Sequence, residues 1–257
     1  MPDTLSEQKY FTTNEGLKLA YHHTAPSSND DPTVVFLGGF MSDMTGSKAS
    51  HLETHCKAKG HGFLRFDYMG HGASEGDFVD GTISLWANNA FDIIAGVTSG
   101  PLILIGSSMG GWVTMLISPR LGRRVKAFIG IAAAPDFTHK MMLPNLSIQQ
   151  LVELRDKGKT LMPNDYDEPY PITRALIDDG GANQVLDGAI EMDMPVHLLQ
   201  GTKDSSVPAD WPEKIKGQLT SDQVEITIVE GGDHSLSLGE NLALLTATLE
   251  DLINKTR

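Results

Sequence analysis

The strongest chemical signal in the sequence is a serine flanked by glycines, in the run GSSMG at residues 106–110. Ser108 is the serine of this run that has glycine both two residues before it and two residues after it. An apolar stretch at 102–105 directly precedes the run, and a helical pattern directly follows it. A strand–turn–helix context of this kind exposes a serine nucleophile above a sheet. It favours nucleophilic acyl transfer over the alternative, a glycine-rich turn with an incidental serine.

A serine hydroxyl also needs a base, and the base needs an orienting carboxylate. His234 lies in GGDHS at 231–235, just after the last expected strand, where the order Ser…Asp/Glu…His places the base. Asp204 lies in GTKDSSVP, after the preceding expected strand. We therefore predict Ser108, Asp204 and His234 as the catalytic residues. Asp136, at the end of an earlier strand, remains an alternative acid, and a solvated loop histidine remains the alternative for His234.

Acyl transfer further requires hydrogen-bond donors for a tetrahedral oxyanion. One expected donor is the backbone N–H of Met109, the residue after the nucleophile. The other is the backbone N–H of Phe40, because the two glycines before it allow the backbone to approach closely. An apolar acyl pocket is predicted from the flexible side chains near the site, although the same residues could instead pack a cap against the core. The predicted pocket residues are Met41, Met141, Met142, Leu143, Leu146 and Met162.

The elements that would position these residues alternate along the chain. Short apolar runs without polar alternation are typical of strands covered on both faces of a parallel sheet. A more alternating pair near the amino terminus indicates an antiparallel edge hairpin. The class is therefore α/β, with a mostly parallel central sheet flanked by helices. The expected strands are 9–13, 17–24, 33–37, 63–68, 102–105, 125–134, 196–199 and 224–229, and the expected helices are 47–59, 83–97, 109–117, 208–216 and 240–255.

One long segment, 136–195, interrupts this alternation without a clear strand. It combines helical apolar spacing with many helix breakers and is too long for an ordinary connection. We interpret it as a helical cap inserted after the strand that ends near Ala134. The prediction is a single domain over 1–257, with its core at 1–135 and 196–257.

Composition excludes several classes of protein. The chain has 257 residues, a formal net charge of −13 and one cysteine, Cys56. Dispersed acidic charge argues against nucleic acid as a partner, and one cysteine excludes a cysteine-based zinc module. His51 and His55 have helical spacing but lack a nearby third ligand, so no metal is expected. No apolar run is long enough to span a membrane, and the polar amino-terminal segment lacks signal-peptide features, so we expect a cytoplasmic protein.

These motifs together resemble the serine hydrolases of the α/β-hydrolase superfamily, from Thr33 to about Ile253. The segments FLGGFMSDMTGSKA, RFDYMGHGASEG and GSSMGGW resemble a narrower group, the mitochondrial depalmitoylase and acyl-glucuronide esterase group with its bacterial relatives. The resemblance implies an α/β-hydrolase fold, with Ser108, Asp204 and His234 as nucleophile, acid and base. It also implies ester or thioester hydrolysis without a cofactor.

The expected function is therefore the hydrolysis of small-molecule or acyl-chain carboxylic esters or acyl thioesters through an acyl-enzyme. The same triad could serve an amide hydrolase, a C–C bond hydrolase or an acyltransferase. A ligand-binding protein that keeps the fold without turnover is a further alternative. The sequence does not indicate an oligomeric state.

Overall fold

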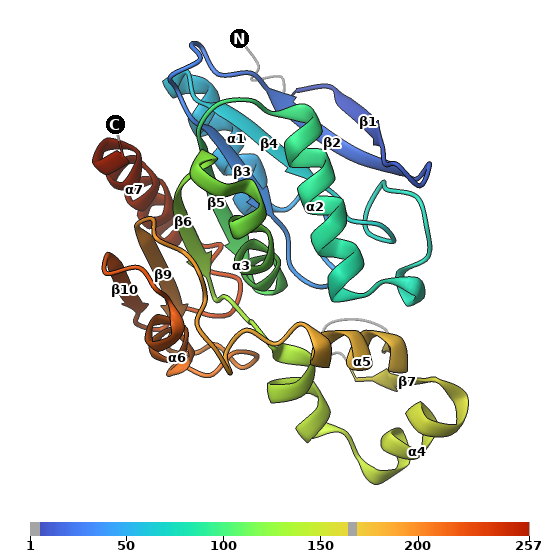
Figure 1. Ribbon diagram of the computed structural model, residues 1–257. Helices are drawn as coiled ribbons and strands as arrows, with labels where there is room; N and C mark the ends of the chain where they lie inside the picture. Colours follow the sequence, from blue (N-terminus) through green and yellow to red (C-terminus); the bar gives the residue numbers. More distant parts are fainter. Residues whose placement is uncertain (1–5, 164–168, 257) are drawn as a thin grey trace.

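The central feature of the computed structural model, which describes residues 6–163 and 169–256, is an eight-stranded sheet (Figure 1). Its strand order is β1-β2-β4-β3-β5-β6-β9-β10. From β4 to β10 neighbouring strands run parallel, whereas β1 and β2 form an antiparallel hairpin at one edge. The predicted mostly parallel sheet is thus confirmed. The strands are β1 (Gln8–Thr12), β2 (Lys18–Thr24), β3 (Thr33–Leu37), β4 (Gly62–Phe66), β5 (Leu102–Ser107), β6 (Val125–Ile131), β9 (Val196–Gly201) and β10 (Val224–Val229).

Helices cover both faces of this sheet (Figure 1). Side chains alternate between the faces along each strand, so Val35 packs with Trp112 in one core cluster while Val34 packs with Leu52 in the other. Both clusters are apolar, which explains why the strand sequences show no polar alternation. The first cluster is covered by α2 (Ile83–Val97), α3 (Met109–Leu121) and α6 (Trp211–Gln218), and the second by α1 (Ser47–Lys59) and α7 (Gly239–Thr256).

The helix ends follow local chemistry, and some of them differ from expectation, as at α6, which was expected at 208–216 and lies at Trp211–Gln218. Thr82 caps α2 by accepting a hydrogen bond from the N–H of Leu85 at 3.3 Å, and α1 ends at Gly60 with a left-handed φ of 78°. Helix α3 was expected to end before Pro119 but continues to Leu121. In the last turn a proline removes few helical hydrogen bonds, so the helix tolerates it there.

The chain between β6 and β9 forms the predicted insertion, beyond the end of the sheet at which β6 stops (Figure 1). Besides helices it contains a two-stranded antiparallel sheet that the sequence analysis did not predict. Each of these strands has four residues, too few for a clear period-2 pattern. The elements are short helical turns at Thr138–Met142 and Leu143–Asn145, then α4 (Ile148–Lys157), β7 (Lys159–Met162), β8 (Tyr170–Thr173) and α5 (Arg174–Ala182). Two further short turns lie elsewhere, at Phe78–Asp80 and Gly122–Arg124.

Strands from before and after the insertion belong to one sheet, which supports the predicted single domain. That domain division stays a prediction, and residues 164–168 of the predicted cap lie outside the described residues. Within the described part of the chain, no helix has both the length and the apolar character that crossing a bilayer requires.

A buried ion pair holds the loop between β3 and α1. Arg65 and Glu53 are each about 1% exposed, and the Nε of Arg65 lies 2.7 Å from Glu53 Oε2. Arg65 also donates to the carbonyl of Met44 at 2.6 Å, and the N–H of Met44 donates to Asp67 at 2.6 Å. Burial alone would raise the pKa of Glu53, but hydrogen bonds from Ser6 and the charge of Arg65 outweigh it and lower that pKa. Glu53 is therefore the anion of the pair.

Two glycines allow a close backbone contact where β5 turns into α3. A Cβ added to Gly106 would lie 2.5 Å from the carbonyl oxygen of Gly110. A Cβ added to Gly110 would lie 2.1 Å from the carbonyl oxygen of Leu37 in β3. Both are steric overlaps with backbone atoms, so β5, α3 and β3 approach this closely only because these two residues are glycine.

We expect Glu53→Gln to lower the free energy of unfolding by about 3–5 kcal/mol, because it leaves the Arg65 cation buried without an anion. Denaturant titration would measure the loss. The double variant Glu53→Leu/Arg65→Met should be less destabilised than the single variant, since no unpaired charge remains. An exposed pair supplies a second control, and Asp178→Asn, which breaks its contact with Arg174, should cost under about 1 kcal/mol. A loss for Glu53→Gln as small as that of Asp178→Asn would contradict the prediction.

We expect Gly106→Ala to destabilise the fold by about 1–3 kcal/mol, because its Cβ would push β5 away from α3. Thermal or denaturant unfolding would measure this. Gly217→Ala is the matched control, because a Cβ there has no atom within 4 Å. It should be neutral or stabilising by up to about 1 kcal/mol, as expected for glycine to alanine in a helix. Equal unfolding midpoints for Gly106→Ala and wild type would contradict the prediction, because they would show that the contact has room for a Cβ.

Candidate active site

Ser108 occupies the turn between β5 and α3 in a conformation that is unusual for a non-glycine residue, with φ 53° and ψ −119°. Its N–H donates to the carbonyl of Ile131 at 2.9 Å, and its carbonyl accepts from the N–H of Ala134 at 3.0 Å. The strained turn is therefore tied to the end of β6 on both sides. Such strain costs free energy and persists where the surrounding structure enforces it.

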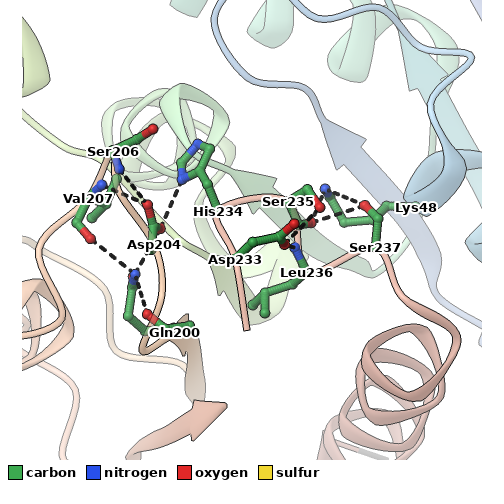
Figure 2. Close-up of polar contacts among 11 residues, drawn as sticks. Lys48, Gln200, Asp204, Ser206, Val207, Asp233, His234, Ser235, Leu236 and Ser237 are labelled. Atoms are coloured by element: carbon green, nitrogen blue, oxygen red, sulfur yellow. Dashed lines mark hydrogen bonds and ion pairs between the residues drawn. The ribbon is translucent and has the colours of Figure 1, made fainter. Parts of the chain in front are cut away.

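His234 and Asp204 come together from neighbouring parallel strands. Asp204 follows β9 and His234 follows β10, so both loops emerge at the same edge of the sheet. His234 Nδ1 lies 2.9 Å from Asp204 Oδ2 (Figure 2). The Asp204 side chain is fully buried, whereas the side chain of His234 is 34% exposed. The carboxylate is thus shielded from solvent while the imidazole remains accessible.

Further hydrogen bonds define the charge of this pair. Asp204 Oδ1 accepts from the N–H groups of Ser206 at 2.8 Å and Val207 at 2.9 Å, and Gln200 donates to Oδ2 at 2.9 Å (Figure 2). Burial would raise the pKa of Asp204, but the contact with His234 and these N–H groups outweigh it and lower the pKa. An ionised Asp204 accepts the proton on Nδ1 of His234, which leaves Nε2 free to accept another proton.

The turn that carries His234 is attached to α1. Lys48 donates its ammonium protons to the carbonyl of Ser235 and, at 3.3 Å, to the hydroxyl of Ser237 (Figure 2). Burial lowers the pKa of Lys48, although nearby Asp233 acts in the opposite direction. Asp233 itself accepts from Ser235 Oγ and the N–H of Leu236, both at 2.9 Å. These contacts hold the turn through residues other than His234 and Asp204.

The alternative acid, Asp136, is used elsewhere. Its side chain is buried and accepts the N–H groups of Val185 at 2.8 Å and Leu186 at 2.9 Å. Burial raises the pKa of Asp136 despite these two hydrogen bonds. Asp136 thus ties the beginning of the insertion to its end, whereas Asp204 contacts His234.

Of the two histidines on α1, His51 and His55, the second contacts a carboxylate on another helix. His55 Nε2 lies 2.8 Å from Glu250 Oε1 on α7. Among the residues that the structure describes, no group of three histidine, cysteine, aspartate or glutamate side chains could hold a metal ion. The single cysteine, Cys56, is buried in the core, and burial raises the pKa of its thiol.

The loop after β3 lies directly against Ser108. A Cβ built on Gly39 would lie 3.3 Å from Ser108 Cβ. The hydroxyl of Tyr68 donates to the carbonyl of Gly38 at 3.3 Å, and the hydroxyl of Ser42 donates to the carbonyl of Gly39 at 3.0 Å. These bonds anchor the loop at its start.

Within the part of the chain that the structure describes, neither predicted oxyanion donor has a hydrogen-bond acceptor. Met109 is the first residue of α3, where a backbone N–H has no partner within the helix. For Phe40, the hydrogen bonds of residues 6–163 and 169–256 include none that uses its N–H. Both N–H groups therefore remain available to a ligand near Ser108, and their role stays a prediction.

Ser108 and His234 line a common cavity of about 640 Å³. Among the described residues no hydrogen bond joins the two side chains. Four of the six predicted pocket residues line the cavity, namely Met41, Met141, Met142 and Met162. Leu143 and Leu146 are not among the lining residues. Leu146 belongs to the core cluster that extends from the sheet into the insertion and Leu143 packs against it, and Met142 is also a member of this cluster. The lining residues Phe137, Tyr170 and Val207 were not predicted from the sequence, because their proximity to Ser108 depends on how the insertion and the Asp204 loop fold back.

A smaller cavity of about 280 Å³ lies on another side of the same two residues. Its walls include the side chains of Ser42, Ser47, Lys48 and Ser237. The first cavity is thus rich in methionine and aromatic side chains, whereas the second is rich in hydroxyl groups. Ser108 and His234 are accessible from both.

Several known proteins are similar to this chain over most of its length. Palmitoyl-protein thioesterase ABHD10, mitochondrial, from Bos taurus is 34% identical over 241 residues, which cover 92% of this chain and 77% of that protein. A putative hydrolase from Agrobacterium vitis S4 superposes with a TM-score of 0.92 at 37% identity, covering 96% of this chain and 98% of the other. Alpha/beta hydrolase domain-containing protein 10 from mouse superposes with a TM-score of 0.89 at 31% identity, covering 98% and 100%.

A sequence model of the alpha/beta hydrolase family matches residues 34–246, which include the strands from β3 to β10, the insertion and the loops that carry Ser108, Asp204 and His234. The predicted fold and the predicted resemblance to the depalmitoylase group are both confirmed. The chain belongs to the alpha/beta hydrolase family.

Proposed function

We propose that the protein is a serine hydrolase that cleaves acyl thioesters or carboxylic esters through an acyl-enzyme intermediate. The observation that carries the proposal is the hydrogen bond between His234 and Asp204, beside a cavity that also contains Ser108. A nucleophile on a strained turn, an accessible imidazole and a buried carboxylate are the three parts that nucleophilic acyl transfer requires.

In the proposed mechanism, Ser108 Oγ attacks the carbonyl carbon of the substrate while His234 Nε2 takes the hydroxyl proton. Asp204 stabilises the imidazolium that results. The N–H groups of Phe40 and Met109 bind the oxyanion of the tetrahedral intermediate. When the C–S or C–O bond breaks, His234 returns the proton to the leaving thiolate or alkoxide. Water then cleaves the acyl-enzyme by the same sequence of proton transfers.

The larger cavity supports an acyl chain as the bound group. Its volume falls within the range of about 300–1,000 Å³ typical of ligand pockets. Unbranched methionine side chains adapt to chains of different length, which suits an acyl group better than one rigid ligand. The name of the mammalian relatives, palmitoyl-protein thioesterase, favours thioesters over oxygen esters. That name also places those relatives in mitochondria, so the cytoplasmic location of this chain stays a prediction.

We expect Ser108→Ala to reduce ester and thioester hydrolysis by about 10⁴-fold or more, because no other group forms the acyl-enzyme. Steady-state hydrolysis of a p-nitrophenyl ester and covalent labelling by a fluorophosphonate would both report the loss. Ser107→Ala is the neighbouring control and should keep most activity and labelling, since Ser108 is the proposed nucleophile. Labelling or turnover that persists in Ser108→Ala would refute the assignment.

We expect long-chain acyl thioesters and p-nitrophenyl esters to be turned over, and matched acyl amides to react much more slowly. The physical reason is that thiolates and phenolates leave readily, whereas an amine must be protonated to leave. A panel of thioesters, esters and amides with increasing acyl length would measure kcat/KM for each. Faster turnover of amides would favour an amide hydrolase, and labelling without any turnover would favour a ligand-binding protein.

A further inference from the structure

Two consecutive N–H groups in the loop after β3 differ in their hydrogen bonding. The N–H of Met41 donates to His71 Nε2 at 3.2 Å. The N–H of Phe40, one residue earlier, is without an acceptor among the described residues. Met41 also has a positive φ of 58°, so the chain bends sharply at the residue that His71 holds. A histidine from the segment after β4 therefore binds the backbone N–H immediately after Phe40.

The hydrogen bonds of His71 define which nitrogen carries its proton. His71 Nδ1 lies 3.1 Å from the carbonyl oxygen of Met69, which also accepts from Trp86 Nε1 at 3.1 Å. A carbonyl can only accept, so Nδ1 is the protonated nitrogen and Nε2 has a lone pair for the N–H of Met41. Burial lowers the pKa of His71, although the Met69 carbonyl acts in the opposite direction, and the ring is therefore neutral at neutral pH.

The ring of His71 is held rigidly. It is 4% exposed and makes edge contacts with Tyr68, Phe78 and Trp86, with ring centroids 5.1–5.6 Å apart. The ring of Phe40 packs against the same group, 5.0 Å from Phe78. The loop is thus attached to this cluster both through the Met41 N–H and through the side chain of Phe40.

We propose that His71 is a positioning residue for oxyanion stabilisation, which acts by binding the N–H of Met41 and so orienting the adjoining N–H of Phe40 toward the reacting carbonyl. His71 accepts the N–H of Met41, so the N–H of Phe40 is the one that remains for the negative charge that develops in the transition state. Because this charge is absent from the bound ester or thioester, the contribution should appear in kcat more than in KM. The inference rests on the proposed function, since it requires an oxyanion.

Two amide variants separate this role from simple packing. In His71→Gln the amide oxygen can approach the former position of Nε2 and accept from Met41, whereas in His71→Asn the shorter side chain reaches only toward Met69. Both variants remove the ring from the aromatic cluster, so packing loss alone should lower their thermal stability and activity alike. We expect His71→Asn to lose about 10- to 100-fold in kcat with KM within about twofold, and His71→Gln to recover most of the loss.

The affinity for a trifluoromethyl ketone, whose adduct with Ser108 carries an oxyanion, should fall in parallel with kcat in His71→Asn and recover in His71→Gln. Equal kcat values for the two variants, or a change confined to KM, would overturn the role of His71 while leaving the proposed hydrolase intact. A wild-type protein that neither turns over esters nor is labelled by a fluorophosphonate would overturn both proposals.

Discussion

The contact between β5, α3 and β3 at Gly106 and Gly110 is the constraint on which the site depends. It brings three backbone segments within distances that any side chain would prevent. Ser108 lies in this turn with a positive φ and lines the cavity. The energy of the strained turn is offset by the packing of the surrounding core, so one serine is presented rigidly on an otherwise buried structure.

A second set of contacts comes from β4 and the segment that follows it. Arg65 and Asp67 bind the two backbone groups of Met44, and His71 binds the N–H of Met41. These side chains are all buried. They attach the loop between β3 and α1 to a neighbouring strand at several points, which keeps it against Ser108. Arg65 pairs with Glu53 and also binds the loop at Met44, so the ion pair contributes to the position of the loop as well as to the stability of the fold.

The proposed base, His234, is held in a different way from the proposed nucleophile, Ser108. Asp204 is buried and accepts several hydrogen bonds, whereas His234 is partly exposed and lies on a turn tied to α1 through Lys48. A fixed acid and an accessible base, the roles proposed for these two residues, suit proton transfer to and from groups of varied shape. The insertion contributes the methionine and aromatic side chains of the larger cavity, so differences in that segment should change the substrate more than the chemistry.

Local features of the sequence were enough to predict the strands, most helices and the serine turn. Apolar periodicity, glycine spacing and caps such as Thr82 act between residues close along the chain, so they can be recognised without a structure. The strand order along the chain also predicted that the Asp204 and His234 loops lie together. The β7–β8 hairpin, the contact of His71 with Met41 and the lining by Phe137 and Tyr170 required the fold. They depend on contacts between segments distant in sequence, as does the use of Asp136 to close the insertion, and no local pattern contains that information.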